Sequence, residues 1–286
     1  MKEINLARQY NPVVLEKLQD TLIEMLNDFK WVCEKYHLTY FAVYGTAIGA
    51  VRHGGFIPWD DDLDVGMMRN DFEKFLQIAE KELGDKYQII SPKTEPNCAV
   101  SVTKIQMKGT KFVSALSTKV KYEQGIFMDI FPFDYVAPKY RQRKRQLFVT
   151  TVLDRLLYLS GDSVVVIPYS GIKKKMAKGI CVIVRCALKI LRVSPTLLFK
   201  LFEEQSTKYN KYKSSRVTCF GQPTALKKMV KKSEMFPVKN VKFGDTTIAI
   251  LNNTDSLLRQ TYGDYMKLPP LEKRINHAPV ILEFKK

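Results

Sequence analysis

Histidine and cysteine, the residues that most often build zinc sites and disulfide frameworks, are both scarce in this sequence. The three histidines are scattered along 286 residues, which argues against a zinc site of the usual kind. The five cysteines show no C-x-x-C spacing, and their odd number argues against a disulfide framework. We therefore expect a protein of a reducing compartment whose fold needs no covalent cross-links.

Long apolar runs are absent as well. No stretch of about 18 uncharged apolar residues occurs, so no membrane-spanning helix is predicted. The first residues contain no apolar segment of the signal-peptide type. With 45% hydrophobic and 26% charged residues the composition is that of an ordinary globular protein, and we expect a cytoplasmic location.

Acidic residues are scarce in one part of the chain, residues 136–215. This segment holds 17 Lys and Arg but only 4 Asp and Glu, a balance of 17 − 4 = +13 in a chain whose net charge is +17. Such charge raises the alternative of a nucleic-acid binder. The basic residues alternate with aliphatic rather than stacking aromatic residues, and no known binding motif appears, so no nucleic-acid partner is expected.

Hydrophobic periodicity predicts both helices and strands, and hence an α+β fold. Helices are expected at residues 13–36, 46–51, 70–83 and 255–262, and in most of 140–212 with an interruption at 160–171. Strands are expected at residues 38–44, 63–67, 87–90, 99–107, 125–131 and 246–251. Asn70, with Glu73 three residues later, is typical of a capping box that opens the third helix.

Four aspartates fall within five positions, at Asp60, Asp61, Asp62 and Asp64. Side chains alternate between the two faces of a strand, so Asp62 and Asp64 would share one face while Leu63 points into the core. Two carboxylates on a rigid strand suit Mg²⁺, with Mn²⁺ as an alternative, and such a metal assists phosphoryl transfer. The alternative is that the acidic cluster forms only a solvated turn.

The residues before the aspartates add a second signal. Gly45 and Thr46 end one predicted strand and open a short helix, where backbone N–H groups can approach a phosphate. Alone, this pattern is weak, because a glycine between a strand and a helix is usually a tight connection. The order of strand, Gly-Thr, short helix and carboxylate-apolar-carboxylate is similar to that of the nucleotidyltransferase-like superfamily.

A longer stretch carries a closer resemblance. The sequence around Arg-His-Gly-Gly-Phe-Ile-Pro-Trp-Asp-Asp-Asp closely resembles the LicD family of phosphotransferases, to which fukutin-related protein is related. The motifs that carry the resemblance lie at residues 44–64, 68–71, 128–134 and 262–277. The resemblance covers roughly residues 15–135 and 215–280, and the basic middle of the chain is unmatched.

The resemblance implies a nucleotidyltransferase-like mixed β-sheet flanked by helices. It also implies transfer of a substituted phosphate from a CDP-linked donor, with release of CMP. The first candidates are phosphocholine as the transferred group and CDP-choline as the donor. The acceptor would be a glycan or a lipid-linked glycan of the cell surface, as in teichoic acid or lipopolysaccharide modification. A rival is nucleotidyl transfer from a nucleoside triphosphate, which would release pyrophosphate instead. A degenerate, non-catalytic member is a further alternative.

On this basis we divide the chain into four parts. They are an N-terminal helix at 1–36 packed on the core, a nucleotidyltransferase-like catalytic core at 37–135, a basic, mainly helical insertion at 136–215, and a C-terminal part at 216–286 that completes the active site.

The superfamily pattern implies a third carboxylate on a neighbouring strand, and Asp129 is the best candidate. It stands alone in an apolar strand, and a buried aspartate needs a partner or a metal to offset its desolvation. Asp129 could complete the metal shell or take a proton from the acceptor hydroxyl. The alternative is a salt bridge to a nearby Lys or Arg. Asp134, beyond Pro132, is predicted to be a loop or capping residue.

Several residues are candidates for substrate contacts. Arg52 could hold phosphate oxygens with its fork of donors, or it could be an ordinary surface charge. Trp59 could stack on a base, a sugar or choline methyl groups, or it could pack in the core. The full set of predicted substrate contacts is Gly45, Thr46, Arg52, His53, Trp59, Arg69, Arg274 and His277.

The basic segment contains a helix with a wide apolar surface and a basic edge, at residues 173–192. This pattern is typical of a helix that lies on anionic lipid, which would place the protein at the inner face of the cell membrane. The alternative, a helix packed in the fold with its charges outward, has equal weight.

Overall fold

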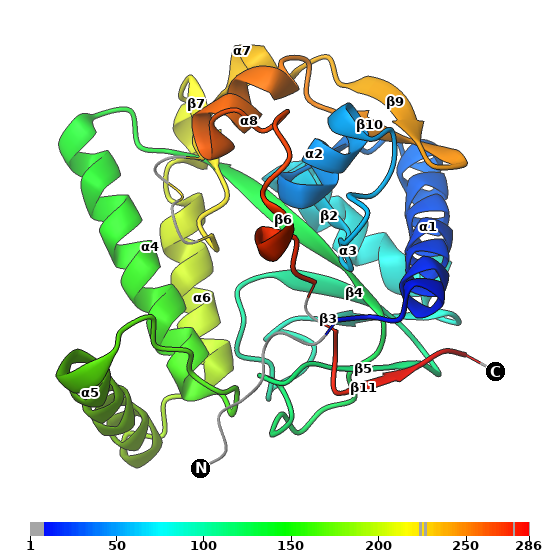
Figure 1. Cartoon of the computed structure of the whole chain (residues 1–286). Coiled ribbons are helices and arrows are strands. Elements are labelled where there is room, and N and C mark those ends of the chain that lie inside the picture. Colours follow the sequence, from blue (N-terminus) through cyan, green and yellow to red (C-terminus); the bar gives the residue numbers. More distant parts are fainter. Residues whose placement is uncertain (1–8, 223–224, 226–227, 277, 286) are drawn as a thin grey trace.

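The computed structural model describes residues 9–222, 225, 228–276 and 278–285 and confirms the α+β class (Figure 1). The helices are α1 (Pro12–Lys35), α2 (Tyr44–Arg52), α3 (Arg69–Leu83), α4 (Tyr140–Ser160), α5 (Gly171–Ile190), α6 (Pro195–Thr207), α7 (Lys232–Met235) and α8 (Thr254–Tyr262). The strands are β1 (Tyr40–Ala42), β2 (Asp64–Met68), β3 (Tyr87–Ile90), β4 (Thr103–Met107), β5 (Lys111–Val113), β6 (Phe127–Tyr135), β7 (Arg216–Thr218), β8 (Val230–Lys231), β9 (Lys239–Phe243), β10 (Thr246–Ile250) and β11 (Ile281–Glu283). Two 3₁₀ turns lie at Asn210–Tyr212 and Leu271–Lys273.

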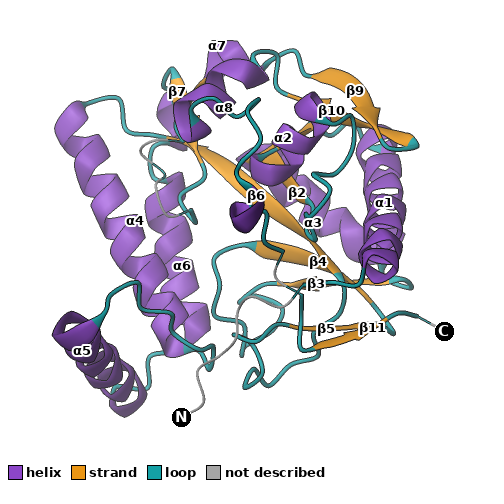
Figure 2. Ribbon diagram, viewed as in Figure 1, coloured by secondary structure: helices purple, strands orange, loops and turns teal. Residues whose placement is uncertain are grey.

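The main sheet is mixed and has the strand order β1-β2-β6-β4-β3 (Figure 2). Strands β2 and β6 run parallel, and the other neighbours in this order are antiparallel. The far end of β6 also pairs with β7, which in turn pairs with β8. Two small sheets, β9–β10 and β5–β11, lie beside the main one. The long strand β6 is therefore the central element, with pairing partners along most of its length.

Different parts of the chain pack against the two faces of the main sheet. Val65 and Met67 of β2, with Ile130 of β6, pack in one large apolar cluster with the buried faces of α1 and α3. Because side chains alternate along a strand, Asp64 and Asp129 point to the opposite face. That opposite face is the one on which the candidate site lies.

Helix α1 shows why the first predicted helix forms. The Asn11 side chain accepts a hydrogen bond from the Val13 N–H, and Pro12 occupies the first helical position, where its missing N–H costs nothing. Eight residues at three- and four-residue steps are buried against the sheet: Leu15, Leu18, Leu22, Met25, Leu26, Phe29, Val32 and Cys33. The sequence periodicity thus predicted both the helix and its buried face.

Helices α4, α5 and α6 form a helical unit with its own apolar cluster, at one side of the molecule (Figure 1). The cluster includes Leu157 of α4, Leu188 of α5, and Leu198, Phe199 and Phe202 of α6. The prediction of a mainly helical middle segment with an interruption near 160–171 is confirmed, since residues 161–170 contain no helix or strand.

Two local predictions were wrong. Helix α3 begins at Arg69 with Met68 as its N-cap, and no side chain caps it, so Asn70 lies inside the helix. Strand β6 does not end before Pro132 but continues to Tyr135, so Asp134 is a buried strand residue and not a loop or cap. The parallel pairing with β2 continues past Pro132, to Met68 and Phe133.

The other predicted elements agree with the structure to within a few residues. The short strands β5, β7, β8, β9 and β11 had not been predicted. In the part of the chain that the structure describes, no helix combines the length and apolarity that a membrane crossing requires.

Candidate active site

Three side chains from neighbouring strands form a row across the sheet. They are Asp64, Asp129 and Lys104, and we call these three residues the carboxylate row after the two aspartates. Asp64 of β2 is the register partner of Asp129 on β6, and Lys104 of β4 is the register partner of Asp129 on the other side. Residues directly opposite each other on paired strands share one face. The Lys104 Nζ atom lies 2.8 Å from Asp129 Oδ1. Thus the salt-bridge alternative for Asp129 is present in the structure, and a metal-binding or proton-accepting role stays a prediction.

Asp62 lies just before β2 rather than on it, because the strand begins at Asp64. The chain here is nevertheless held against β6, since the Asp129 N–H donates to the Leu63 carbonyl at 2.9 Å. Leu63 and Val65 are fully buried, as the alternation predicted. Burial and nearby charges, that of Asp129 among them, raise the pKa of Asp62. The predicted pair, Asp62 and Asp64, therefore lies beside Asp129, but only Asp64 is held in position by a strand.

The loop that carries Asp60 and Asp61 is fastened to the N-terminal part of the chain. The Tyr10 hydroxyl donates to Asp61 Oδ2 at 2.9 Å, and the Gln19 side-chain amide donates to the Asp60 carbonyl at 2.8 Å. Residue 10 precedes α1 and Gln19 lies on it. Helix α1 therefore both fills the core and positions the aspartate loop.

The carboxyl groups of the site are crowded, and burial and mutual repulsion both disfavour their charged forms. Burial raises the pKa of Asp64 well above its usual value, and the charges of Asp62, Asp129 and Asp60 raise it further. Burial also raises the pKa of Asp62 and of Asp60, again with help from neighbouring carboxylates. Lys104 opposes the shifts at Asp62 and Asp64 only in part. An added cation would relieve this repulsion.

The donor set can be tested against the predicted Mg²⁺. Among the described residues, no group of three or more His, Cys, Asp and Glu side chains is already arranged to hold a metal ion. The chemistry of the donors nevertheless fits, because they are carboxylate oxygens, which hard divalent cations prefer. In addition, the buried Oδ2 atom of Asp60 has no hydrogen-bond partner. A buried carboxylate oxygen without a donor is suited to a cation.

Gly45 and Thr46, predicted to approach a phosphate, both contact the aspartates. The Thr46 hydroxyl accepts a hydrogen bond from the Asp64 N–H at 2.8 Å, which fixes the start of β2. A Cβ atom on Gly45 would lie 2.9 Å from Asp60 Oδ2, so glycine is needed for this close approach. Gly45 and Thr46 lie in the first turn of α2, so the predicted anion-binding position is next to the carboxylates.

Arg52, Trp59 and Arg274 lie together at the edge of the site. The Arg274 guanidinium lies 5.3 Å from the centre of the Trp59 ring. Burial and the charge of Arg274 both lower the pKa of Arg52. Arg52 donates to the Tyr265 carbonyl and, at 3.4 Å, to His53 Nδ1. Burial and Arg52 lower the pKa of His53. Trp59 also packs against the main apolar cluster, as the core-packing alternative has it, and its stacking on a substrate group stays a prediction.

Among the described residues, one predicted substrate contact, Arg69, is not part of this arrangement. Arg69 is buried and its guanidinium is occupied by Asp134 at 2.6 Å and Glu203 at 3.2 Å. Its donors are therefore used inside the fold, and the structure gives it a role in holding elements together rather than in binding substrate. His277 lies outside the described residues.

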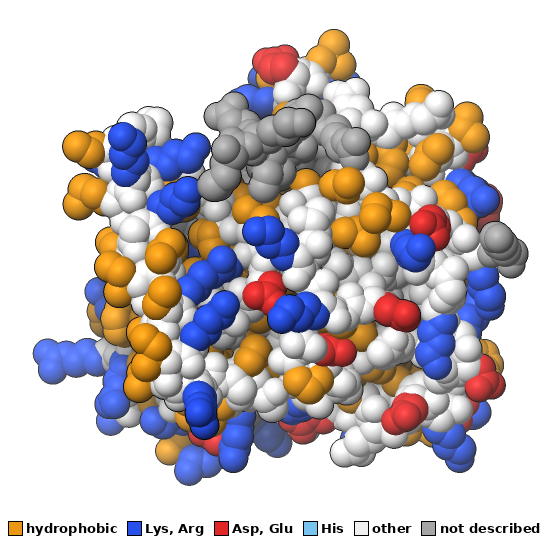
Figure 3. Space-filling view, turned by 90° about the horizontal axis from the view of Figure 1, so that it is seen from below, with side chains coloured by type: hydrophobic (Ala, Val, Ile, Leu, Met, Phe, Trp, Pro, Cys, Tyr) orange, Lys and Arg blue, Asp and Glu red, His pale blue; other side chains and the backbone are white. Residues whose placement is uncertain are grey.

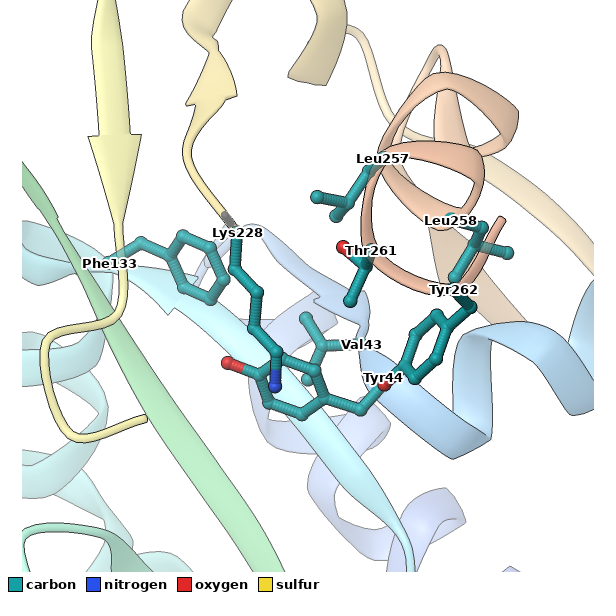
Figure 4. A pocket seen from close by; sticks show the side chains of 8 residues that line it. All are labelled: Val43, Tyr44, Phe133, Lys228, Leu257, Leu258, Thr261 and Tyr262. Atoms are coloured by element: carbon teal, nitrogen blue, oxygen red, sulfur yellow. The ribbon is translucent and has the colours of Figure 1, made fainter. Parts of the chain in front are cut away.

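The sequence did not point to three residues beside the carboxylates, namely Lys104, Lys228 and Tyr262. Lys228 lies with its Nζ atom 4.2 Å from the centre of the Tyr44 ring, in a small pocket that α8 closes (Figure 4). Burial lowers the pKa of Lys228, and the nearby charge of Asp64 opposes that shift. Burial raises the pKa of Tyr262, and the nearby charge of Asp64 raises it further. Lys228 follows a stretch with no regular pattern, so no sequence signal marked it.

Comparison with known proteins agrees with this geometry. The model of the LicD/FKTN/FKRP nucleotidyltransferase domain matches residues 37–151. The chain is 26% identical over 270 residues to the lipopolysaccharide cholinephosphotransferase LicD of Haemophilus influenzae, and the match covers 93% of this chain and 96% of that protein. It is also 41% identical over 73 residues, a quarter of this chain, to an uncharacterised protein of Rickettsia typhi. The carboxylate row lies within the matched residues, so the candidate site falls in the part of the chain that is similar to the nucleotidyltransferase domain of the LicD family.

Proposed function

We propose that this protein transfers phosphocholine from CDP-choline to a hydroxyl group of a cell-surface glycan or glycolipid precursor and releases CMP. The observation that carries the proposal is the carboxylate row beside the α2 N-terminus, in a chain similar along 93% of its length to a lipopolysaccharide cholinephosphotransferase. A transferase of the LicD type is the enzyme class to which this similarity points.

The donor's phosphates would lie between the α2 N-terminus and the basic edge of the site. Gly45 and Thr46 bring the first turn of α2 to the aspartates, and helix N-termini favour anions. Arg52 and Arg274 supply positive charge on the other side, and Trp59 offers a flat apolar surface for the cytosine or the choline group. Lys228 is a further cation within reach of Asp64.

In the transfer step the acceptor hydroxyl oxygen forms a bond to the phosphorus of phosphocholine. The bond between that phosphorus and the bridging oxygen of CMP breaks, and CMP leaves with the bond's electron pair. Asp129 takes the hydroxyl proton, and the Lys104 ammonium at 2.8 Å holds Asp129 in place. Asp62 and Asp64 would hold Mg²⁺ or Mn²⁺, which when bound neutralises phosphate charge.

The test is a panel of donors, CDP-choline, CDP-ribitol, CDP-glycerol and CDP-ethanolamine, with Mg²⁺ and a glycan acceptor, in which CMP is measured. We expect acceptor-dependent CMP release from CDP-choline, reduced at least about 100-fold in Asp64→Asn. Exposed Asp85→Asn is the matched control and should retain wild-type turnover. Pyrophosphate release from CTP, without CMP release from any of these donors, would replace the proposal with nucleotidyl transfer.

A further inference from the structure

One face of α5 carries a row of exposed apolar side chains. Ile172, Met176, Ile183 and Ile190 follow one another at steps of four, seven and seven residues, so they lie on one side of the helix. Their side chains are 76%, 64%, 69% and 80% exposed. We call these four residues the α5 stripe. A stripe of four large exposed aliphatic side chains at helical spacing is unusual on a free surface.

The other side of α5 makes the contacts with the protein. Leu188 is its one buried residue among those described, and Val184 packs beside Leu188 in the apolar cluster of the helical unit. Arg185 donates to the Ser163 carbonyl and thereby ties α5 to the loop after α4. Since this inner side is already satisfied, the α5 stripe faces away from the molecule and is available to a partner.

Positive charge borders the α5 stripe and negative charge is missing. Residues 163–202 contain eight Lys and Arg and no Asp or Glu. Lys173 and Lys175, both exposed, fall on opposite borders of the stripe at helical spacing. In Figure 3, seen from below, hydrophobic side chains gather along the left edge of the molecule, where Figure 1 places α4 and α5, with Lys and Arg side chains beside them.

We propose that α5 lies flat on an anionic lipid bilayer, with the α5 stripe among the upper acyl chains and the bordering lysines at the lipid phosphates. An apolar face bordered by lysines is the pattern of an interfacial helix, and α5 does not qualify as a membrane-crossing helix. A second copy of the chain would bring the same lysines together, and a nucleic acid would leave the aliphatic side chains unused. The bilayer satisfies both the apolar stripe and the charge.

The test is co-sedimentation of the full chain with vesicles of phosphatidylcholine mixed with phosphatidylglycerol, against vesicles of phosphatidylcholine alone. We expect binding to the mixed vesicles and at least about tenfold weaker binding to the neutral ones. Ile183→Glu should weaken binding to the mixed vesicles about tenfold or more, because it puts a charge in the middle of the α5 stripe. The matched control is Val13→Glu, an equally exposed aliphatic on α1, which should bind like the wild type.

A second variant tests the charges independently. Replacing Lys173, Lys174 and Lys175 by Gln should also weaken binding about tenfold or more and should reduce its sensitivity to salt. Equal binding of wild type and Ile183→Glu would overturn the proposal. So would a dimer in solution that Ile183→Glu dissociates without any effect on vesicles, or tight RNA binding that neither variant changes.

This inference does not depend on the proposed reaction. CMP release with a soluble acceptor should be unchanged in Ile183→Glu. Vesicle binding without CMP release from any donor would contradict the proposed function but support the proposal that α5 binds a membrane.

Discussion

At the scale of single residues, the candidate site places several carboxyl groups close together. Asp64 is surrounded by Asp62, Asp129 and Asp60, and Lys104 is paired to Asp129. Burial and mutual repulsion both disfavour the charged forms, so the arrangement costs stability as long as no cation is added. Active sites commonly exchange stability for function in this way.

Replacing Asp64 by Asn should therefore abolish turnover and stabilise the protein. In EDTA we expect the Tm of Asp64→Asn to exceed that of the wild type by about 2 °C or more, because one of the repelling charges is gone. Mg²⁺ should raise the Tm of the wild type and have little effect on the variant. Differential scanning calorimetry measures both. A lower Tm in EDTA, or an equal Mg²⁺ response, would contradict the assignment of Asp64 as a crowded cation ligand.

Gly45 offers a second test at the same scale. The Cβ atom of Gly45→Ala would displace the Asp60 carboxylate from its position 2.9 Å away, and displacement of an active-site group typically costs 10-fold or more in rate. We expect turnover to fall about tenfold, with the Tm within a few degrees of the wild type. The control is Gly179→Ala, which meets no atom within 4 Å and should retain full turnover with a soluble acceptor. Normal turnover of Gly45→Ala would show that the close approach is unimportant.

At the scale of secondary structure elements, Arg69 ties three of them together. It stands at the start of α3 and pairs with Asp134 on β6 and Glu203 on α6. The Asn210 amide also donates to Asp134, at 2.7 Å. This buried network fastens the helical unit to the sheet.

Breaking the network should be costly. Arg69→Met leaves Asp134 buried without its cation, and we expect the free energy of unfolding to fall by about 3–5 kcal/mol. Urea unfolding followed by circular dichroism measures the change. Lys111→Met, which breaks an exposed pair with Glu283, should cost at most about 1 kcal/mol. Equal effects of the two changes would mean that the buried network contributes nothing special.

The elements that the sequence predicted well are those whose signal is local. The apolar period of α1 and the alternation of Leu63 and Val65 are visible within a few residues, and both agree with the structure. Asp134 was misassigned because Pro132 looked like a strand end, while the pairing of β6 with β2 and β7 that carries the strand onward is not visible locally.

The same distinction between local signals and long-range pairing applies to the residues of the candidate site. Alternation selected Asp62 and Asp64 from four neighbouring aspartates, but only Asp64 lies on the strand that this argument assumed. Asp129 came from the family resemblance. Lys104 became a neighbour of Asp129 only through the register of β4 on β6. Lys228 was missed because it comes to the site from a segment without periodicity. Register between distant strands is a property of the folded sheet, which one sequence does not display.

At the scale of the whole molecule, the described apolar interior comprises the large sheet core, a smaller cluster around Phe41 and Phe133, and the cluster of the helical unit. Helix α1 buries eight side chains, seven of them in the sheet core, whereas α5 buries Leu188 alone among its described residues. Elements with few buried contacts open at lower free energy than the core does.

Hydrogen exchange should reveal this difference. We expect the amides of α5 to exchange much faster than those of α1, with α4 and α6 between them, because opening α5 exposes little apolar surface. Mass spectrometry of peptides that cover each helix measures the order. Protection of α5 equal to that of α1 in the protein alone would contradict the division described here.

Strand β6 carries Asp129 near its beginning and Asp134 near its end, so one strand connects the site with the attachment of the helical unit. Five residues of extended chain span about 17 Å, and a strand paired along its length stretches little. The strand therefore keeps a fixed distance between the active site and the attachment point of the helical unit. With α5 resting on a bilayer, it would hold the carboxylates at a fixed height, and an acceptor on a tether of the wrong length would fail to reach them, however well its sugar fitted.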